Sequence, residues 1–275
     1  AVSLMELEDK DTRDNSPKAN MKKAIRIFSK APTALSAFFR SRKGKKIIKP
    51  KKNLTFSENF FYMCFGKIPS NEIVKAFDVS LILYAEHSFN VSTFTARTIT
   101  SSLSDIHGAI TGAIASLKGP LHGGANEEVM HMMKKIKKPE NAFKWINKAL
   151  DKKEVIMGFG HRVYKKGDSR VPTMEKYFRK VSKIKADKKF IKIYDIVKNV
   201  MIDKKNIHPN VDYPTGPTYH LMGFDTDFFT PIFVMSRITG WSAHIMEQHT
   251  ANKLIRPLSK YSGADHRKVM LLNQR

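Results

Sequence analysis

The sequence has almost no cysteine: Cys64 is the single one among 275 residues. One cysteine excludes an internal disulfide framework and a cysteine-rich zinc site, and it suits a reducing compartment. No apolar run is long enough to predict a transmembrane helix, and residues 1–20 lack the apolar core of a signal peptide. The chain begins at Ala1 rather than at methionine, so we expect it to start inside a longer protein.

Negative charge is also scarce, and the formal net charge at pH 7 is +24. Such a charge by itself indicates nucleic acid or an anionic surface as a partner. The lysines, however, are spread along most of the chain, and the densest basic run, residues 40–52, has no interleaved aromatics for base stacking. We therefore prefer a generally lysine-rich surface, with no nucleic-acid partner. A basic nucleic-acid-binding helical protein is the alternative.

Apolar residues recur mostly at helical spacing, which predicts an all-α fold. The longest predicted helices cover residues 70–87, 95–119, 138–153 and 227–254. The third is expected to bury Phe143, Ile146 and Leu150. Only residues 154–160 look strand-like, and residues 206–225, which are punctuated by proline and glycine, are interpreted as a long functional loop.

Breaks rich in glycine and proline divide the chain. They occur at residues 119–128 and 206–225 and suggest a smaller domain inserted in a larger helical one. The predicted division is a large domain over 1–121, a small domain over 122–222, and a return to the large domain over 223–275.

Three residues of catalytic type lie beside these breaks. His122 precedes two glycines, His161 follows Gly-Phe-Gly, and Asp212 precedes Tyr-Pro. A single residue of this kind is more often a helix cap, a surface group or a turn former than a catalytic group. Together they indicate loops that surround a ligand with side chains and backbone.

Arginine is rare, with 12 of the 49 basic residues, so its positions are informative. Arg170, Arg237 and Arg256 stand in or near the same segments. Their planar guanidinium groups bind carboxylates bidentately, although surface ion pairs are the alternative. A site with arginines, two histidines and one aspartate suits a small polycarboxylate and proton transfer next to a carbonyl.

Other chemistries find little support. His244 and Glu247 stand three residues apart as a possible ligand pair, but no third ligand is evident, and no metal is expected. No nucleophile elbow, Walker loop or dinucleotide fingerprint occurs, so no cofactor is expected either.

Five segments carry a resemblance to a known family. They are "AEHSFNVSTFTAR", "GPLHGGANE", "GFGHRVYKKGDSR", "NVDYPTG" and "FTPIFVMSRITGWSAHIMEQ" followed by "LIRP". In this order they resemble citrate synthases of the bacterial type, including 2-methylcitrate synthases. The likeness runs from about residue 1 to residue 262.

The resemblance implies an all-α homodimer whose large domain and smaller mobile domain close over the substrates. It implies condensation of acetyl-CoA with oxaloacetate to citrate and CoA, as in the tricarboxylic acid cycle, with propionyl-CoA and 2-methylcitrate as the alternative. An inactive, interaction-only relative is a further alternative. The implied location is the bacterial cytoplasm, or the mitochondrial matrix in a eukaryote, with no membrane partner. Because family members extend further at the N-terminus, we expect the 275-residue chain alone to fold poorly or be inactive.

The resemblance also assigns roles by motif position. Asp212 would be the base that removes the methyl proton of acetyl-CoA. His122 would hydrogen-bond the thioester oxygen, and His161 would protonate the ketone of oxaloacetate. His87, Arg170 and Arg237 would hold oxaloacetate, while Arg256 would reach the partner subunit's site.

The same motifs place CoA along Gly158, Phe159, Gly160 and Asn210. Lys165 and Lys166 are expected to be solvated or to attract a distant phosphate.

Overall fold

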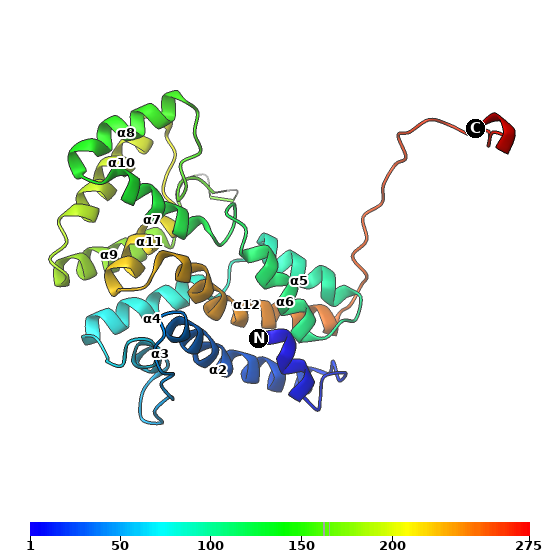
Figure 1. The fold of residues 1–275 in the computed structure, drawn as a ribbon, viewed down its shortest axis with the longest axis horizontal. Helices are drawn as coiled ribbons and strands as arrows, with labels where there is room; N and C mark the ends of the chain where they lie inside the picture. The colour runs from blue at the N-terminus through cyan, green and yellow to red at the C-terminus, as the bar shows by residue number, and fades with distance from the viewer. Residues whose placement is uncertain (162, 165) are drawn as a thin grey trace.

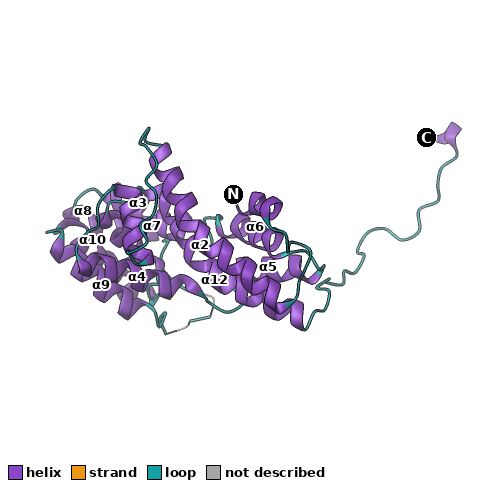
Figure 2. Cartoon of the chain, turned by 90° about the horizontal axis from the view of Figure 1, so that it is seen from below, coloured by secondary structure: helices purple, strands orange, loops and turns teal. Residues whose placement is uncertain are grey.

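Helices form the secondary structure of residues 1–161, 163–164 and 166–275, which the computed structural model describes (Figure 2). The α-helices are α1 (Val2–Met5), α2 (Pro17–Ser41), α3 (Phe56–Phe65), α4 (Asn71–Ala85), α5 (Val91–Ser101), α6 (Ile106–Leu117), α7 (Ala125–Ile136), α8 (Pro139–Asp151), α9 (Val171–Ile184), α10 (Lys189–Lys205), α11 (Asp212–Met222) and α12 (Phe229–Thr250). Short 3₁₀ helices are η1 (Glu6–Glu8), η2 (Thr226–Phe228) and η3 (Leu272–Gln274). The predicted all-α class is confirmed.

Capping side chains fix where several helices begin. Ser16 accepts a hydrogen bond from the backbone at the start of α2, and Asn90 does the same for α5. Thr55 and Glu58 form a reciprocal capping box at α3. Each of these caps satisfies backbone N–H groups that a helix start leaves unpaired.

α12 is the central helix of one half of the molecule and packs against α2, α4, α5 and α6 (Figure 1). α7, α8, α9, α10 and α11 pack mainly on one another, and α4 contacts α9. The division into 1–121, 122–222 and 223–275 stays a prediction.

Phenylalanines build much of the core between α3 and α4. The rings of Phe60 and Phe77 stack with their centroids 5.4 Å apart, and Phe224 reaches both from the turn after α11. All three side chains are buried. Burial of each such ring stabilises the fold by about 1.5–3 kcal/mol, which anchors α4 and therefore its C-terminal end.

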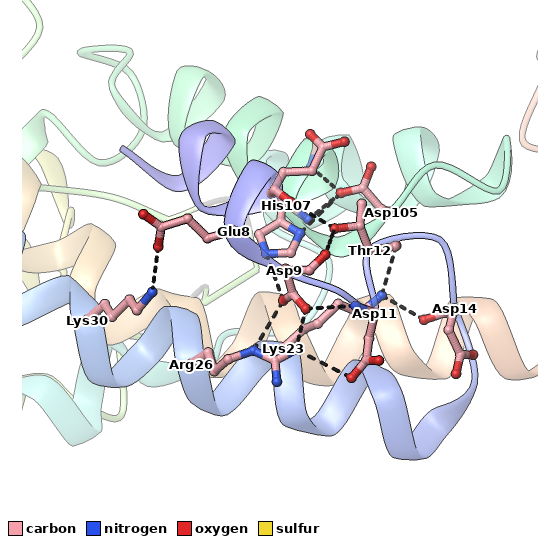
Figure 3. A network of polar contacts seen from close by, with 12 residues as sticks. Glu8, Asp9, Asp11, Thr12, Asp14, Lys23, Arg26, Lys30, Asp105 and His107 are labelled. Carbon is pink, nitrogen blue, oxygen red and sulfur yellow. Dashed lines mark hydrogen bonds and ion pairs between the residues drawn. The ribbon is translucent and has the colours of Figure 1, made fainter.

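Charged side chains tie the N-terminal segment to α2 and α6 (Figure 3). Asp9 accepts hydrogen bonds from Nε and Nη2 of Arg26 and lies 3.5 Å from Nε2 of the buried His107. Lys23 is fully buried, and its Nζ donates to the carbonyl of Asp14 at 2.7 Å. A buried ammonium is tolerated only with such hydrogen-bond partners.

The helix predicted over residues 95–119 is wrong, because the chain forms two helices there. Leu103 adopts a left-handed backbone conformation with φ +66°, which ends α5. Asp105 then caps α6 by accepting from the backbone of His107 and Gly108. The apolar stripe continues across the break, so periodicity did not reveal it.

The long loop predicted over residues 206–225 is also wrong, since α11 occupies most of it. Pro214 falls in the first turn, where a missing N–H costs nothing. Pro217 lies inside the helix, and all residues from Tyr213 to Tyr219 are buried. Tertiary packing thus maintains a helix that its prolines disfavour.

Two smaller predictions fail. Phe143 on α8 is 59% exposed, whereas Ile146 is buried and Leu150 partly so. The strand expected at residues 154–160 is reduced to an isolated bridge between Phe159 and Pro209. The predicted helices over 70–87 and 227–254 correspond to α4 and α12.

Asn252 and Ile255 hydrogen-bond to Ser101 at the end of α5, and residues 256–275 then extend away from the helices as an exposed arm (Figure 1). Among the described residues, no helix is both long and apolar enough to cross a membrane.

Candidate active site

The C-terminal end of α4 is the point at which the predicted site residues meet. The last carbonyls of a helix have no partner within the helix and attract cations. Here the carbonyl of Tyr84 accepts from Nε of Arg237 at 2.6 Å, and that of Leu83 lies 3.5 Å from Nη1 of Arg170. One helix end therefore holds two arginines from α12 and from the start of α9.

Arg237 is unusually deprived of partners. Its side chain is only 2% exposed, and its Nη1 makes no hydrogen bond to any described residue. Burial and the nearby charge of Arg170 lower the pKa of Arg237 to about 10. A buried cation with an unused donor favours an anionic ligand at that point.

Arg170 is held by a buried carboxylate. Asp168 binds it through Nε at 3.0 Å and Nη2 at 2.8 Å, and also accepts from the backbone N–H of Val211 at 3.0 Å. Burial alone would raise the pKa of Asp168, but the hydrogen bonds and charge of Arg170 outweigh it and lower that pKa. Asp168 thereby joins the loop that carries Arg170 to the residue just before Asp212.

Asp212 is the first residue of α11, where the helix dipole favours a negative charge. Its Oδ1 accepts a hydrogen bond of 2.5 Å from the hydroxyl of Tyr84. Burial raises the pKa of Asp212 to about 6, against the opposing effects of Tyr84 and Arg170. The carboxylate is therefore mostly ionised at neutral pH and close to the proton affinity of a useful general base.

His122 lies in the turn between α6 and α7. Its Nε2 is 3.3 Å from the backbone N–H of Ser92 and 2.8 Å from the Ser92 hydroxyl. Because a backbone N–H can only donate, Nε2 accepts, and the neutral ring carries its proton on Nδ1. Burial and the charge of Arg237 lower the pKa of His122 to about 4, which keeps the ring neutral at pH 7.

His161 has the opposite tautomer. Its Nδ1 accepts from the backbone N–H of Val163 at 3.0 Å and of Tyr164 at 3.3 Å, so Nε2 carries the proton. Its ring centroid is 5.0 Å from that of His87, whose Nε2 lies 3.1 Å from the hydroxyl of Tyr164. Burial lowers the pKa of His161, and burial with the charge of Arg170 lowers the pKa of His87 to about 4.

The segment Gly158–Gly160 pairs with the chain just before α11. The Gly160 N–H donates to the His208 carbonyl, and the Asn210 N–H donates to the Gly158 carbonyl, each at 2.9 Å. The Asn210 side chain donates to the Gly160 carbonyl at 3.0 Å, and the ring centroids of Phe159 and Tyr213 lie 4.4 Å apart. Contact of these residues with CoA stays a prediction, but they form one connected unit.

Other predicted residues lie elsewhere. Arg256 is exposed at the start of the C-terminal arm. Lys166 is exposed, and Lys165 lies outside the described residues. His244 contacts Glu86 at 3.2 Å, and the part of the chain that the structure describes has no group of three or more metal-ligand residues.

Four polar residues of the site were not predicted: Tyr84, Ser92, Tyr164 and Asp168. The position of Asp168 two residues before Arg170 in a loop is a sequence feature that could have indicated it as a partner of that arginine. Tyr84 looked like one more apolar position on the α4 stripe, and no pattern distinguished Ser92.

The arrangement combines a base with two neutral imidazole donors and two arginines. Asp212 can take a proton, while Nδ1–H of His122 and Nε2–H of His161 can each donate to a carbonyl oxygen. Such a set suits removal of a proton from a weak carbon acid and attack on a second carbonyl of an anionic substrate.

Comparisons with known proteins agree on one family. The model for "Citrate synthase, C-terminal domain" matches residues 1–258. A 2-methylcitrate synthase of Mycobacterium tuberculosis is 53% identical over 267 residues, which are 97% of this chain and 67% of that protein. A citrate synthase of Mycolicibacterium smegmatis is 49% identical over 270 residues, which are 98% of this chain and 72% of that protein.

Solved structures agree in fold. The citrate synthase of Thermoplasma acidophilum, in a ternary complex with carboxymethyl coenzyme A and oxaloacetate, superimposes with a TM-score of 0.91 at 32% identity, covering 100% of this chain and 74% of that one. The citrate synthase of Thermotoga maritima gives a TM-score of 0.85 at 39% identity, covering 94% and 71%.

Proposed function

Because this chain belongs to the citrate synthase family, we propose that it condenses an acyl-CoA thioester with oxaloacetate and then hydrolyses the product to release CoA. The observation that carries the proposal is the convergence of Asp212 and two arginines at the end of α4, with His161 beside His87 just after that helix and His122 near Arg237. Asp212 would take a proton from the acyl α-carbon, which then forms a C–C bond to the ketone carbon of oxaloacetate. Water would cleave the thioester.

Proton removal is the difficult step, because a thioester α-proton is a very weak acid. The enolate must therefore be stabilised by a donor held ready in a water-poor site. Nδ1–H of His122 supplies this donor, since Ser92 occupies Nε2. One such donor accelerates a reaction by about 10²–10³.

Oxaloacetate would be bound and activated by the remaining groups. The unused Nη1 of Arg237 and the guanidinium of Arg170 offset its two carboxylates, with His87 beside them. Nε2–H of His161 would donate to the ketone oxygen and transfer its proton as the new C–C bond forms.

The CoA moiety would lie along Gly158–Gly160 and Asn210. We assign Arg256 to the active site of a second copy in a homodimer. This assignment is supported by the exposed, extended arm that begins at Arg256.

The chemistry uses the protein's own acids and bases, so no resident cofactor is needed, and turnover should survive exhaustive chelation. The single cysteine and the bacterial relatives support a location in the bacterial cytoplasm.

Both acetyl-CoA and propionyl-CoA are supported as substrates, because the relatives include citrate synthases and 2-methylcitrate synthases at similar identity. One methylene is worth only about 1–3 kcal/mol of discrimination in a pocket. The ratio of kcat/KM for the two acyl-CoAs with oxaloacetate measures the preference directly.

The proposed role of Asp212 is tested by release of free CoA from acyl-CoA and oxaloacetate by the full-length protein. Asp212→Asn removes the base and is expected to lower kcat by at least about 10². Wild-type kcat/KM should fall as the pH drops below about 6, since the base becomes protonated.

The matched control is Asp203→Asn, which makes the same chemical change on the exposed end of α10. It should retain wild-type turnover. Equal CoA release by both variants would refute the assignment of Asp212.

A further inference from the structure

Tyr84 makes the closest polar contact of the proposed base. Its hydroxyl is 2.5 Å from Oδ1 of Asp212, and its side chain is fully buried in the last turn of α4. The ring centroids of Tyr84 and Phe233 lie 4.0 Å apart, and the backbone carbonyl of Tyr84 accepts a hydrogen bond from Arg237. Both ends of the residue are thus fixed, and the phenol has little freedom to turn away from the carboxylate.

Asn126 determines the direction of this hydrogen bond. Its Nδ2 donates to the Tyr84 oxygen at 3.4 Å, and Asn126 is fully buried near the start of α7. A phenol carries one proton. With the amide donating to the oxygen of Tyr84, that proton points at Asp212.

We propose that Tyr84 and Asn126 form a positioning pair that engages Oδ1 of Asp212 and leaves Oδ2 as the oxygen that takes the substrate proton. The inference rests on the proposed role of Asp212 as the base. Tyr84 and Asn126 act through Asp212, so they are positioning residues. By donating to the ionised carboxylate, the pair keeps the base charged in a buried place.

Other charged groups also face Asp212 and remain when Tyr84 is changed. They are Arg170 and Asp168 from the loop before α9 and Arg237 from α12. Removal of the phenol hydroxyl therefore tests a single hydrogen bond against a constant background. Because that bond stabilises the charged carboxylate, its loss must raise the pKa of Asp212.

The test is the pH dependence of kcat/KM for the acyl-CoA with full-length Tyr84→Phe at saturating oxaloacetate. The apparent pKa of the acid limb of this pH–rate profile is expected to shift upward by about one pH unit, as for the loss of a hydrogen bond to a charged group. The rate should fall about tenfold at pH 5.5 and much less at pH 8. A merely structural role would lower the rate at every pH and leave the limb in place.

Tyr219→Phe is the matched control, because it removes another buried phenol hydroxyl, one that contacts Ser80 rather than Asp212. Its acid limb should not move. Asn126→Leu is the second variant if Tyr84→Phe does not fold, and it should raise the limb by a smaller amount. An unmoved limb in both pair variants would overturn the proposal.

A titration of the Asp212 carboxyl carbon by ¹³C NMR, assigned with Asp212→Asn, requires no turnover. An upward shift in Tyr84→Phe supports the pair even if the protein releases no CoA, in which case only the proposed function fails. Normal turnover with an unchanged titration would overturn the pair and leave the function intact.

Discussion

Arg237 carries the strongest single-residue indication of an anionic ligand, because its Nη1 is buried and unpaired among the described residues. Arg237→Met is expected to lower kcat/KM for oxaloacetate about 10- to 100-fold, the loss of a hydrogen bond to a charged group. It should also abolish the rise in Tm that oxaloacetate gives the wild-type protein. A thermal-shift titration with oxaloacetate measures this effect.

Arg179→Met is the control for that titration. Arg179 forms ion pairs with Glu175 and Asp195 on the surface and lies outside the site. This variant should keep the oxaloacetate-dependent rise in Tm. If Arg237→Met kept it too, Arg237 would not bind the substrate.

At the residue scale, the sequence predicted the reactive groups better than their partners. His122, His161 and Asp212 stand beside glycine or proline, so their positions alone drew attention. Tyr84 and Ser92 act through contacts with residues far away in the chain, Asp212 and His122. Such contacts depend on how helices are rotated against one another, and no local pattern encodes that rotation.

Gly158 and Gly160 offer a matched pair at the scale of one segment. Both have positive φ, +84° and +76°. A Cβ at position 158 would lie 2.5 Å from Cγ2 of Val129, whereas one at position 160 would lie 3.5 Å from the Ile207 side chain, an ordinary contact. Gly158→Ala therefore adds a steric clash to the backbone strain that both variants share.

Gly160→Ala is expected to lower the free energy of unfolding by about 1–2 kcal/mol from the left-handed backbone alone. Gly158→Ala should cost a further 1–3 kcal/mol, roughly, from overpacking. Urea midpoints compared at equal m-values measure the difference. Equal losses would show that Val129 and Tyr213 move aside easily.

At the element scale, apolar periodicity correctly predicted α4 and α12, but it did not predict α11 or the break between α5 and α6. α11 was read as a loop because proline and glycine punctuate it, yet burial on all sides keeps it helical. The break between α5 and α6 was missed because it depends on one left-handed residue and the Asp105 cap. The helical α11 matters for function, since it places Asp212 at a helix N-terminus.

For the whole molecule, burial of neutral histidines couples stability to pH. Burial lowers the pKa of six histidines: His87, His107, His122, His161, His220 and His249. Unfolding returns each to its ordinary pKa near 6.5, so below that pH the unfolded chain binds more protons and stability falls. Asp212 acts in the opposite sense between about pH 6 and 4, because burial raises its pKa, but it is one group against six.

We therefore expect Tm to fall as the pH is lowered from 7.5 to 5. A further fall is expected below pH 4 as carboxylates such as Asp168, whose pKa is lowered by Arg170, take up protons.

His107 is the residue to test, because it is buried between Asp9 and Asp105 and lies outside the proposed site. Burial outweighs the two carboxylates in lowering the pKa of His107. His107→Gln cannot be protonated, so it should reduce the difference in Tm between pH 7.5 and 5, whatever its Tm at pH 7.5. His266→Gln, on the exposed C-terminal arm, provides the same substitution without burial and should leave that difference unchanged. A His107→Gln protein with the full wild-type pH dependence would show that this histidine takes up its proton in the folded state as readily as in the unfolded chain.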